Sequence, residues 1–225
     1  SIANQKNTRI INLRTPPKPL SVASGKPRSG KRLLTVGTDC CVGKKYTALA
    51  IYREMQHQNI NSTFRASGQT GILIAGMGIP IDAVVSDFIS GAAEMLSPEN
   101  ARDHWDIIEG QGSLFHPAYA AVTLGLLHGS QADAMVLCHS VNRTHIDEYL
   151  DYEIPPITDC IQQYEQSASL TNPNARVIGI SVNTSTLSIS ARSKYLERLG
   201  DLSGLPCFDP LIDELTPIVE ALTSN

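Results

Sequence analysis

Residues 37–47, GTDCCVGKKYT, have the composition and spacing of a loop that binds phosphate. They follow a short apolar run and end where a helical pattern begins. Glycines at positions 37 and 43 allow successive backbone N–H groups to point into one concavity. Lys44 can reach terminal phosphate oxygens beside the positive end of the following helix. The pattern therefore predicts phosphate binding rather than a plain turn.

The loop departs from the standard phosphate-binding pattern in two respects. Five residues separate Gly37 from Gly43, where the standard loop has four. Lys45 stands in the place of the serine or threonine that ligates magnesium. A lysine cannot ligate a metal, although it can neutralise phosphate charge, and Thr47, one helical turn from Lys44, is a doubtful substitute. This departure weakens the case for nucleotide hydrolysis.

A group of hydrogen-bond donors follows the second apolar run, in the segment FRASGQTG at residues 64–71. Arg65 is the most suggestive of them, because a guanidinium suits a carboxylate. Gln69 and Thr70 can add further donors for a substrate. For the hydroxyls of Ser67 and Thr70, a turn that satisfies its own side chains is an equally good interpretation.

An acid ends the third apolar run, in the segment WDIIEGQGSLFHPAY at residues 105–119. Glu109 precedes Gly110, so its carboxylate should stand at the edge of the sheet beside the phosphate loop. An acid at this place can hold magnesium or orient water, or it can serve as a general base. His116 and Tyr119 open the next helical pattern, where each can equally cap or pack.

The remaining polar candidates give weaker signals. Asp82, Asp87 and Glu94 lie on a helical pattern at 81–96, where a solvated face is the default interpretation, although Asp87 flanks a strongly apolar stripe. An acid near a helix N-terminus also favours the helix dipole without any further role. His139 and Asn183 each follow an apolar run, and neither is informative alone.

Short apolar runs alternate with helical patterns from residue 32 onward, which predicts βαβ crossovers and a mainly parallel sheet flanked by helices. The expected strands are residues 32–36, 62–66, 105–108, 134–138 and 176–182. The expected helices are residues 44–58, 81–96, 117–128, 157–168 and 190–199. Ligands of such sheets bind at the carboxyl ends of the strands, where every motif above falls.

Composition limits the class of protein. The chain has 225 residues and a net charge of −4, which gives no general attraction to nucleic acid or anionic membrane. Residues 1–32 carry eight lysines and arginines, no acid and several prolines. We interpret residues 1–31 as a basic, proline-rich linker or extension and residues 32–225 as the α/β domain.

The cysteines and the lengths of the apolar runs indicate where in the cell the protein is located. The five cysteines form no Cys-x-x-Cys pair, which favours reduced thiols in a cytoplasmic protein. No apolar run is long enough to span a bilayer. Because neither nucleic acid nor a membrane is indicated, we expect a small molecule as the partner. A homo-oligomer is possible, and the sequence leaves the oligomeric state open.

Taken together, these segments resemble the phosphate-loop domain of the D-glutamate N-acetyltransferase family, long catalogued as a domain of unknown function. The resemblance covers residues 9 to about 210, and it is most specific at residues 109–130. Members usually carry an additional N-terminal α/β domain, and the basic start of this chain resembles the linker that would follow it. The segments that carry it are TVGTDCCVGKKYTAL, ASGQTGILI, IDAVVSDFISGAAE, WDIIEGQGSLFHPAYAAVTLGLLHGS and ADAMVLCH.

The resemblance implies an acetyl transfer from acetyl-CoA to the amine of an acidic amino acid, with D-glutamate as the expected acceptor. The coenzyme A phosphates would lie on residues of the loop and the first turn of the helix: Gly37, Thr38, Asp39, Gly43, Lys44, Lys45 and Thr47. The substrate carboxylates would lie on Arg65, Gln69 and Thr70, with His116 as a further substrate contact. Glu109 or Asp87 would accept the proton of the amine. No metal is required in this interpretation.

Two alternatives stay open. The loop is more distantly similar to that of dethiobiotin synthetase, which would make the protein an ATP- and magnesium-dependent ligase or kinase with Glu109 and Asp87 on the metal. A P-loop module that is inactive without an additional domain is the second alternative. Lys45 argues against the first of these, because it removes the hydroxyl that would ligate magnesium.

Overall fold

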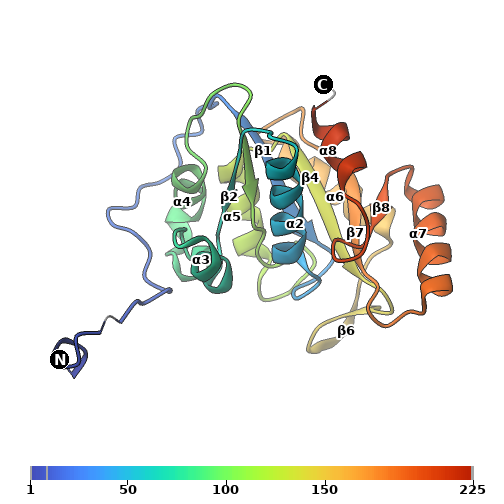
Figure 1. Cartoon of the computed structure of the whole chain (residues 1–225), viewed down its shortest axis with the longest axis horizontal. Coiled ribbons are helices and arrows are strands. Elements are labelled where there is room, and N and C mark those ends of the chain that lie inside the picture. The colour runs from blue at the N-terminus through green and yellow to red at the C-terminus, as the bar shows by residue number, and fades with distance from the viewer. Residues whose placement is uncertain (1, 9, 224–225) are drawn as a thin grey trace.

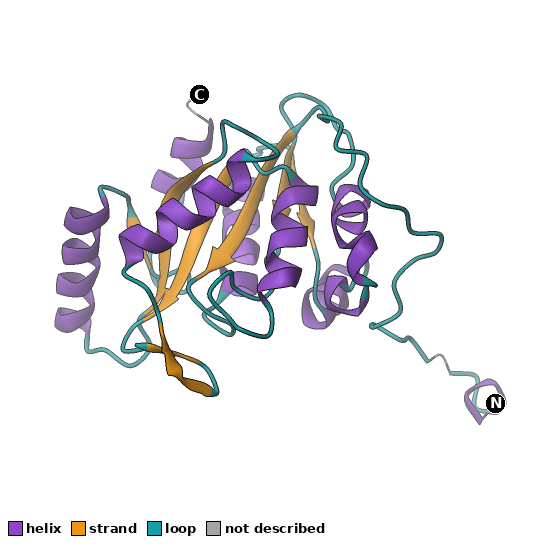
Figure 2. Cartoon of the chain, turned by 180° about the vertical axis from the view of Figure 1, so that it is seen from behind, coloured by secondary structure: helices purple, strands orange, loops and turns teal. Residues whose placement is uncertain are grey.

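The computed structural model describes residues 2–8 and 10–223 of the chain. Its centre is a six-stranded sheet with the order β2–β3–β1–β4–β7–β8, in which every neighbouring pair is parallel. The strands are β1 (Lys31–Gly37), β2 (Ser62–Arg65), β3 (Trp105–Ile108), β4 (Ala134–Ser140), β7 (Arg176–Asn183) and β8 (Cys207–Phe208). A short antiparallel hairpin, β5 (His145–Ile146) and β6 (Tyr149–Glu153), projects from the body (Figures 1 and 2).

Helices cover both faces of the sheet (Figures 1 and 2). One face packs against α2 (Lys44–His57) and α8 (Thr216–Thr223), and the other packs against α4 (Ile89–Leu96), α5 (Ala120–Ser130) and α6 (Ile157–Ser169). Strand β1 shows why two layers are needed, because Leu33 belongs to the first core and Leu34 to the second. Strands that are buried on both faces read as continuous apolar runs.

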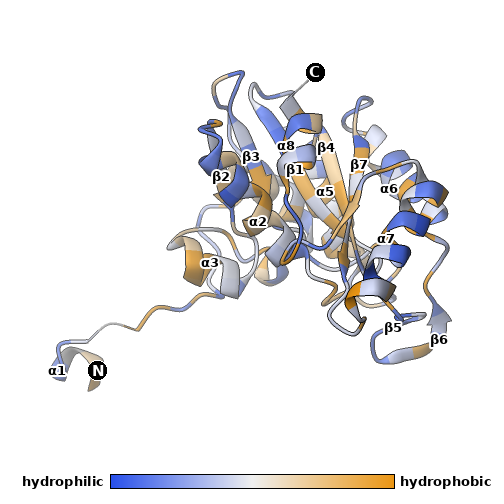
Figure 3. Cartoon of the chain, turned by 45° about the vertical axis from the view of Figure 1, so that its right-hand side comes forward, coloured by the Kyte–Doolittle hydropathy of each residue, from blue (hydrophilic) through white to orange (hydrophobic). Residues whose placement is uncertain are grey.

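The remaining helices lie at the margins of the sheet. Helix α7 (Ile189–Ser203) packs beside the edge strand β8, and it is largely polar in colour, while the central strands are apolar (Figure 3). Helix α3 (Gln69–Ala75) follows β2, and α1 (Ile2–Gln5) lies in the N-terminal extension. Two short 3-10 helices, η1 (Ile81–Ala83) and η2 (Ser86–Phe88), precede α4.

The predicted fold class and the five predicted strands are confirmed, as are four of the five helices, with ends that differ by a few residues. The helix predicted over residues 81–96 is wrong in its first half, because the α-helix begins only at Ile89. Val84 and Val85 adopt extended backbone angles between the two 3-10 helices. β-branched side chains favour that conformation over helix. The sequence also did not predict α3, the β5–β6 hairpin, β8 or α8.

The N-terminal extension is partly packed on the domain. The backbone N–H groups of Ser24 and Gly25 donate to the Glu94 carboxylate of α4, at 2.8 and 2.9 Å. Arg28 donates to the carbonyls of Gly129 and Ser130 at the end of α5. The domain boundary at residue 31 stays a prediction, and residues 1, 9 and 224–225 lie outside the part of the chain that the structure describes.

Two further observations concern the sequence-based expectations about compartment. Within residues 2–8 and 10–223, every helix is too short or too polar to cross a membrane. All five cysteines are free thiols. The cytoplasmic location stays a prediction.

Candidate functional site

The loop between β1 and α2 is shaped around one lysine. Lys44 opens α2, and its ammonium group turns back to donate a hydrogen bond of 2.7 Å to the backbone carbonyl of Asp39. Gly43 precedes the helix with a φ of 108°, a left-handed conformation that favours glycine. A Cβ atom on Gly37 would lie 2.9 Å from the Lys44 Nζ, so the first glycine leaves room for the ammonium group.

Three of the residues expected to hold phosphate instead form hydrogen bonds that attach the loop to the rest of the protein. The Thr38 hydroxyl bonds the His139 ring at 3.1 Å. The Asp39 carboxylate accepts from the Arg143 guanidinium and from the backbone N–H of Asp147, each at 2.8 Å. The Thr47 hydroxyl lies 2.7 Å from the hydroxyl of Ser181.

These contacts leave the side chains of Thr38, Asp39 and Thr47 unable to reach a ligand in the cavity. All three residues are buried, and none of them lines the cavity beside the loop. Gly37 likewise lies beneath it. The Thr47 hydroxyl is engaged inside the protein, which leaves it unsuited to replace the missing magnesium ligand.

A cavity of about 800 Å³ lies at the carboxyl edge of the sheet beside the loop. Ligand sites commonly enclose roughly 300–1,000 Å³, so the size suits a large small molecule. Loops after β1, β2 and β3 converge here because these strands are adjacent and parallel. Six of the predicted site residues line the cavity: Gly43, Lys44, Lys45, Gln69, Thr70 and Glu109.

Glu109 is the buried acid of this cavity, with 4% of its surface exposed. Its Oε2 atom accepts hydrogen bonds of 3.1 Å from the backbone N–H groups of Ser67 and Gly68. A Cβ atom on Gly71 would lie only 2.1 Å from the same oxygen, so the carboxylate fits against the face of α3 where the helix carries no side chain. The carboxylate is therefore held in one place.

The charges of the site are tuned mainly by burial. Burial raises the pKa of Glu109, although the two backbone donors and Lys45 and Lys44 act in the opposite direction. Burial also lowers the pKa of Lys44. Both shifts bring the ordinary pKa of the group nearer to neutral pH, as is common for groups that exchange protons in catalysis. Lys45 is less buried, and its Nζ lies 5.0 Å from the centre of the Tyr46 ring.

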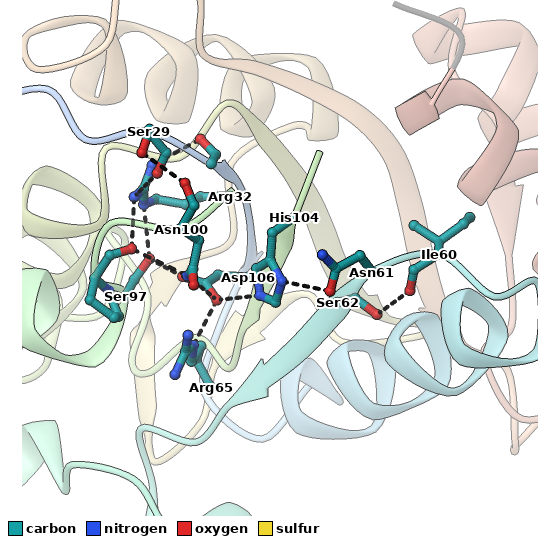
Figure 4. Close-up of polar contacts among 12 residues, drawn as sticks. Ser29, Arg32, Ile60, Asn61, Ser62, Arg65, Ser97, Asn100, His104 and Asp106 are labelled. Atoms are coloured by element: carbon teal, nitrogen blue, oxygen red, sulfur yellow. Dashed lines mark hydrogen bonds and ion pairs between the residues drawn. The ribbon is translucent and has the colours of Figure 1, made fainter. Parts of the chain in front are cut away.

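Arg65 is directed away from the cavity. Its Nε atom donates a hydrogen bond of 2.7 Å to the buried carboxylate of Asp106, which also accepts from Ser97 and Asn100 (Figure 4). Asp106 is 1% exposed and needs a cationic partner. The expectation that Arg65 receives a substrate carboxylate therefore disagrees with its geometry, because it does not line the cavity.

Asp87 and His116 also lie outside the cavity lining. Asp87 sits exposed on η2, as the default interpretation of a solvated face expected. His116 is buried, and its Nδ1 atom accepts the backbone N–H of Ala118 at 3.1 Å. Its ring packs against Tyr119 and Tyr149, with centroids 4.5 and 5.1 Å away. His116 thus supports Tyr119, which does line the cavity.

One grouping of metal-ligand types occurs among the described residues, formed by Asp39, Cys40 and His116. Two of its three side chains, those of Asp39 and His116, already bind neighbouring groups. Asp39 accepts from Arg143 and from two backbone N–H groups, and an Nδ1 that accepts from Ala118 leaves the proton of a neutral His116 on Nε2. The donor set therefore fits a metal poorly, and the expectation of a metal-free site stays a prediction.

Sequence reasoning missed several residues of the cavity. Gln111 lies between Gly110 and Gly112, and the same glycine turn that singled out Glu109 could have indicated it. No signal pointed to Arg14, because it lies in the extension interpreted as a linker. Further lining residues were not singled out as site residues or were judged uninformative: Cys40, Cys41, Tyr46, Asp82, Tyr119 and Asn183.

Comparison with known proteins places this geometry in a family. Residues 21–219 match the family described as a domain of unknown function, the DUF1611 P-loop domain. The chain belongs to this family. The structure is also similar to the crystal structure of a DUF1611 family protein from Anabaena variabilis, with a TM-score of 0.88, 35% identity, and coverage of 95% of this chain and 64% of that one.

Two curated relatives carry a more specific name. A D-glutamate N-acetyltransferase of a Pseudoalteromonas species is 53% identical over 99% of this chain, and one from Tritonibacter scottomollicae is 46% identical over 100% of it. The resemblance stated from the sequence is thereby confirmed. The chain spans 67% of the length of each of these relatives.

Proposed function

We propose that this protein transfers an acetyl group from acetyl-CoA to the amine of D-glutamate. One observation carries the proposal: the lysines of the phosphate loop and the buried carboxylate of Glu109 line the same cavity. The names of the relatives that are 53% and 46% identical supply the reaction and the acceptor. Because these relatives are longer than this chain, the activity of the whole protein is part of the proposal.

The phosphates of coenzyme A would lie on the loop at Gly43, Lys44 and Lys45. Each of these residues lines the cavity, and the N-terminus of the 14-residue helix α2 adds its partial positive charge. No phosphoryl group is transferred, so a magnesium ligand is not needed at position 45. A second lysine there adds charge for phosphate instead.

Glu109 would serve as the general base. The acceptor amine attacks the thioester carbon, a C–N bond forms, the C–S bond breaks, and coenzyme A leaves as its thiolate. The amine must lose a proton in this sequence, and the Glu109 carboxylate would accept it. A raised pKa makes the carboxylate a stronger base than a solvent-exposed glutamate, while its hydrogen bonds from Ser67 and Gly68 fix its position.

Thermal unfolding with and without ligands, combined with an acetyl-transfer assay, tests the proposal. We expect coenzyme A to raise the melting temperature without magnesium, and acetyl-CoA to acetylate D-glutamate. Lys44→Ala should weaken coenzyme A binding roughly ten- to a hundredfold, since it removes a charge-assisted hydrogen bond.

Arg53→Ala is the matched control, because Arg53 is an exposed cation on the same helix that does not line the cavity. It should leave coenzyme A binding unchanged. Stabilisation by ATP that requires magnesium, without stabilisation by coenzyme A, would instead support a ligase or kinase.

A further inference from the structure

Arg14 brings a third cation into the cavity from a segment far away in sequence. The described lining contains three cationic side chains, Arg14, Lys44 and Lys45. The two lysines belong to the phosphate loop, whereas Arg14 belongs to the N-terminal extension. The extension approaches the domain closely here, because Leu13 packs against the core that contains α2 and Phe64.

The local contacts of Arg14 leave most of its guanidinium available. Its side chain is 57% exposed, and an ion pair joins its Nη2 to the Asp82 Oδ2 at 3.1 Å. Asp82 lines the same cavity and is itself 35% exposed. An exposed ion pair of this kind contributes little to folding. The pair is thus a weak structural contact that an incoming carboxylate can replace.

The other cations of the region have partners that exclude them from this role. Arg65 is bound to the buried Asp106, and Lys44 belongs to the phosphate loop, where it is assigned to the donor. Lys45 neighbours the loop and suits phosphate. An acidic amino acid brings two carboxylates into the cavity, and they require a cation that the donor does not occupy. Arg14 meets that requirement.

We propose that Arg14 binds a carboxylate of the acidic amino-acid acceptor and so determines specificity for it. This inference rests on the proposed function and adds a residue to it. The guanidinium can form two parallel hydrogen bonds with a carboxylate, which a lysine cannot do. The exposed ion pair with Asp82 is the contact that this carboxylate replaces.

The test measures KM for D-glutamate and for acetyl-CoA in the purified chain and in Arg14→Gln. We expect the KM for D-glutamate to rise about tenfold or more, with the KM for acetyl-CoA unchanged within about twofold. Lys18→Gln is the matched control, since it removes an exposed charge from the same segment outside the cavity lining. It should change neither constant.

Asp82→Asn separates substrate binding from a structural role of the ion pair. It breaks the same ion pair but leaves the guanidinium in place, so the KM for D-glutamate should stay within about twofold of the parent value or fall. An equal rise in Asp82→Asn and Arg14→Gln would overturn the inference. So would an unchanged KM in Arg14→Gln, or a rise confined to acetyl-CoA, which would assign Arg14 to a phosphate.

The failure of the proposed function gives a different result. If the parent chain acetylates no acidic amino acid, the proposed function is wrong, and calorimetric titration with D-glutamate then decides about Arg14. Binding that is present in the parent chain and lost in Arg14→Gln supports the site. Absence of binding in the parent chain rejects it.

Discussion

Glu109 illustrates how a single residue combines a cost in stability with a chemical role. Its carboxylate receives two backbone hydrogen bonds and faces two lysines, yet burial still raises its pKa. The folded protein therefore disfavours the ionised form relative to the unfolded chain, in which the carboxyl group is in water. Such a charge destabilises the fold at neutral pH, and function is the usual reason for retaining it.

Glu109→Gln should therefore lower activity and raise stability together. The amide retains the shape and can still accept hydrogen bonds, but it cannot take the proton of the amine. We expect kcat to fall by about 10²–10⁴-fold. The melting temperature should rise at neutral pH, because the disfavoured charge is gone. Initial-rate kinetics and thermal unfolding measure the two effects.

The sign of the pH dependence follows from the raised pKa of Glu109. Below its ordinary value of 4.5 the carboxyl group is neutral in both states. As the pH rises through 4.5 toward the higher folded pKa, the unfolded chain gains charge first. The stability advantage of Glu109→Gln should thus grow with pH and then level off. Glu197→Gln, on the exposed side of α7, should show no such trend. If Glu109→Gln had the kcat of the parent protein, Glu109 would not be the general base.

Arg65 and Arg14 show where residue-level prediction from sequence reaches its limit. The chemical argument for an arginine that binds carboxylates selected Arg65, which ends β2. Its partner Asp106 lies within the next apolar strand and could not be identified as buried from local sequence alone. Arg14 reaches the cavity only because the extension folds back on the domain, a long-range contact that leaves no local pattern.

At the scale of elements, the sequence predicted strands better than it predicted helix ends. The strands are short apolar runs, and burial on both faces makes them distinct. The pattern over residues 81–96 has helical spacing, but its first half includes Val85, which is 66% exposed. The sequence did not predict α3, in which Gly71 is a weak helix former, and that glycine is needed to accommodate Glu109.

The β5–β6 hairpin is coupled to the phosphate loop through one buried carboxylate. Asp39 in the loop is fully buried. It accepts from the side chain of Arg143, which precedes β5, and from the backbone N–H of Asp147 in the turn between β5 and β6. Arg143 also donates to the Cys40 carbonyl at 3.2 Å. The position of the loop therefore depends on an element that follows it by about a hundred residues in sequence.

Arg143→Gln should weaken both the fold and the donor site. Loss of the cation leaves Asp39 with backbone donors alone, which we expect to cost roughly 1–3 kcal/mol in the free energy of unfolding. The KM for acetyl-CoA should rise, because the loop is less well held. Urea unfolding and initial-rate kinetics measure the two changes.

Asp147→Asn is the matched control for Arg143→Gln. It removes the exposed acid that lies 3.4 Å from Arg143 but keeps the backbone N–H that binds Asp39. An exposed pair contributes little, so the free energy of unfolding should change by less than about 1 kcal/mol. If both variants behave alike, the coupling of hairpin and loop through Asp39 is wrong.

At the scale of the whole molecule, the sequence predicted the layers of the fold but not the neighbours within them. Alternation of strands and helices indicates a parallel sheet with helices on both faces. The order β2–β3–β1–β4–β7–β8 is fixed by contacts between residues that are distant in sequence. That order brings Glu109 beside the loop, since β3 pairs directly with β1.

The free energy of unfolding should depend on pH partly through one buried histidine near the end of β4. His139 is 7% exposed, and its Nδ1 atom bonds the Thr38 hydroxyl of the phosphate loop. Burial, with a smaller effect from Arg143, lowers the pKa of His139 from 6.5 to about 4. The folded protein thus holds a neutral imidazole over a range in which the unfolded chain binds a proton.

Acidification from pH 6.5 to about 4 should therefore destabilise the parent protein more than His139→Asn. In this window the unfolded chain takes up one proton that the folded protein does not, so stability falls as the pH falls, by at most about 1.4 kcal/mol per pH unit for one group. Asparagine has no charge to gain and can still bond the Thr38 hydroxyl. Urea unfolding of both proteins at several pH values measures the difference in their free energies of unfolding, which cancels the shared titration of the carboxylates. That difference should turn steadily against the parent protein on acidification and become constant below pH 4. A difference that is independent of pH would mean that His139 titrates alike in the folded and unfolded states, and that its burial does not control its charge.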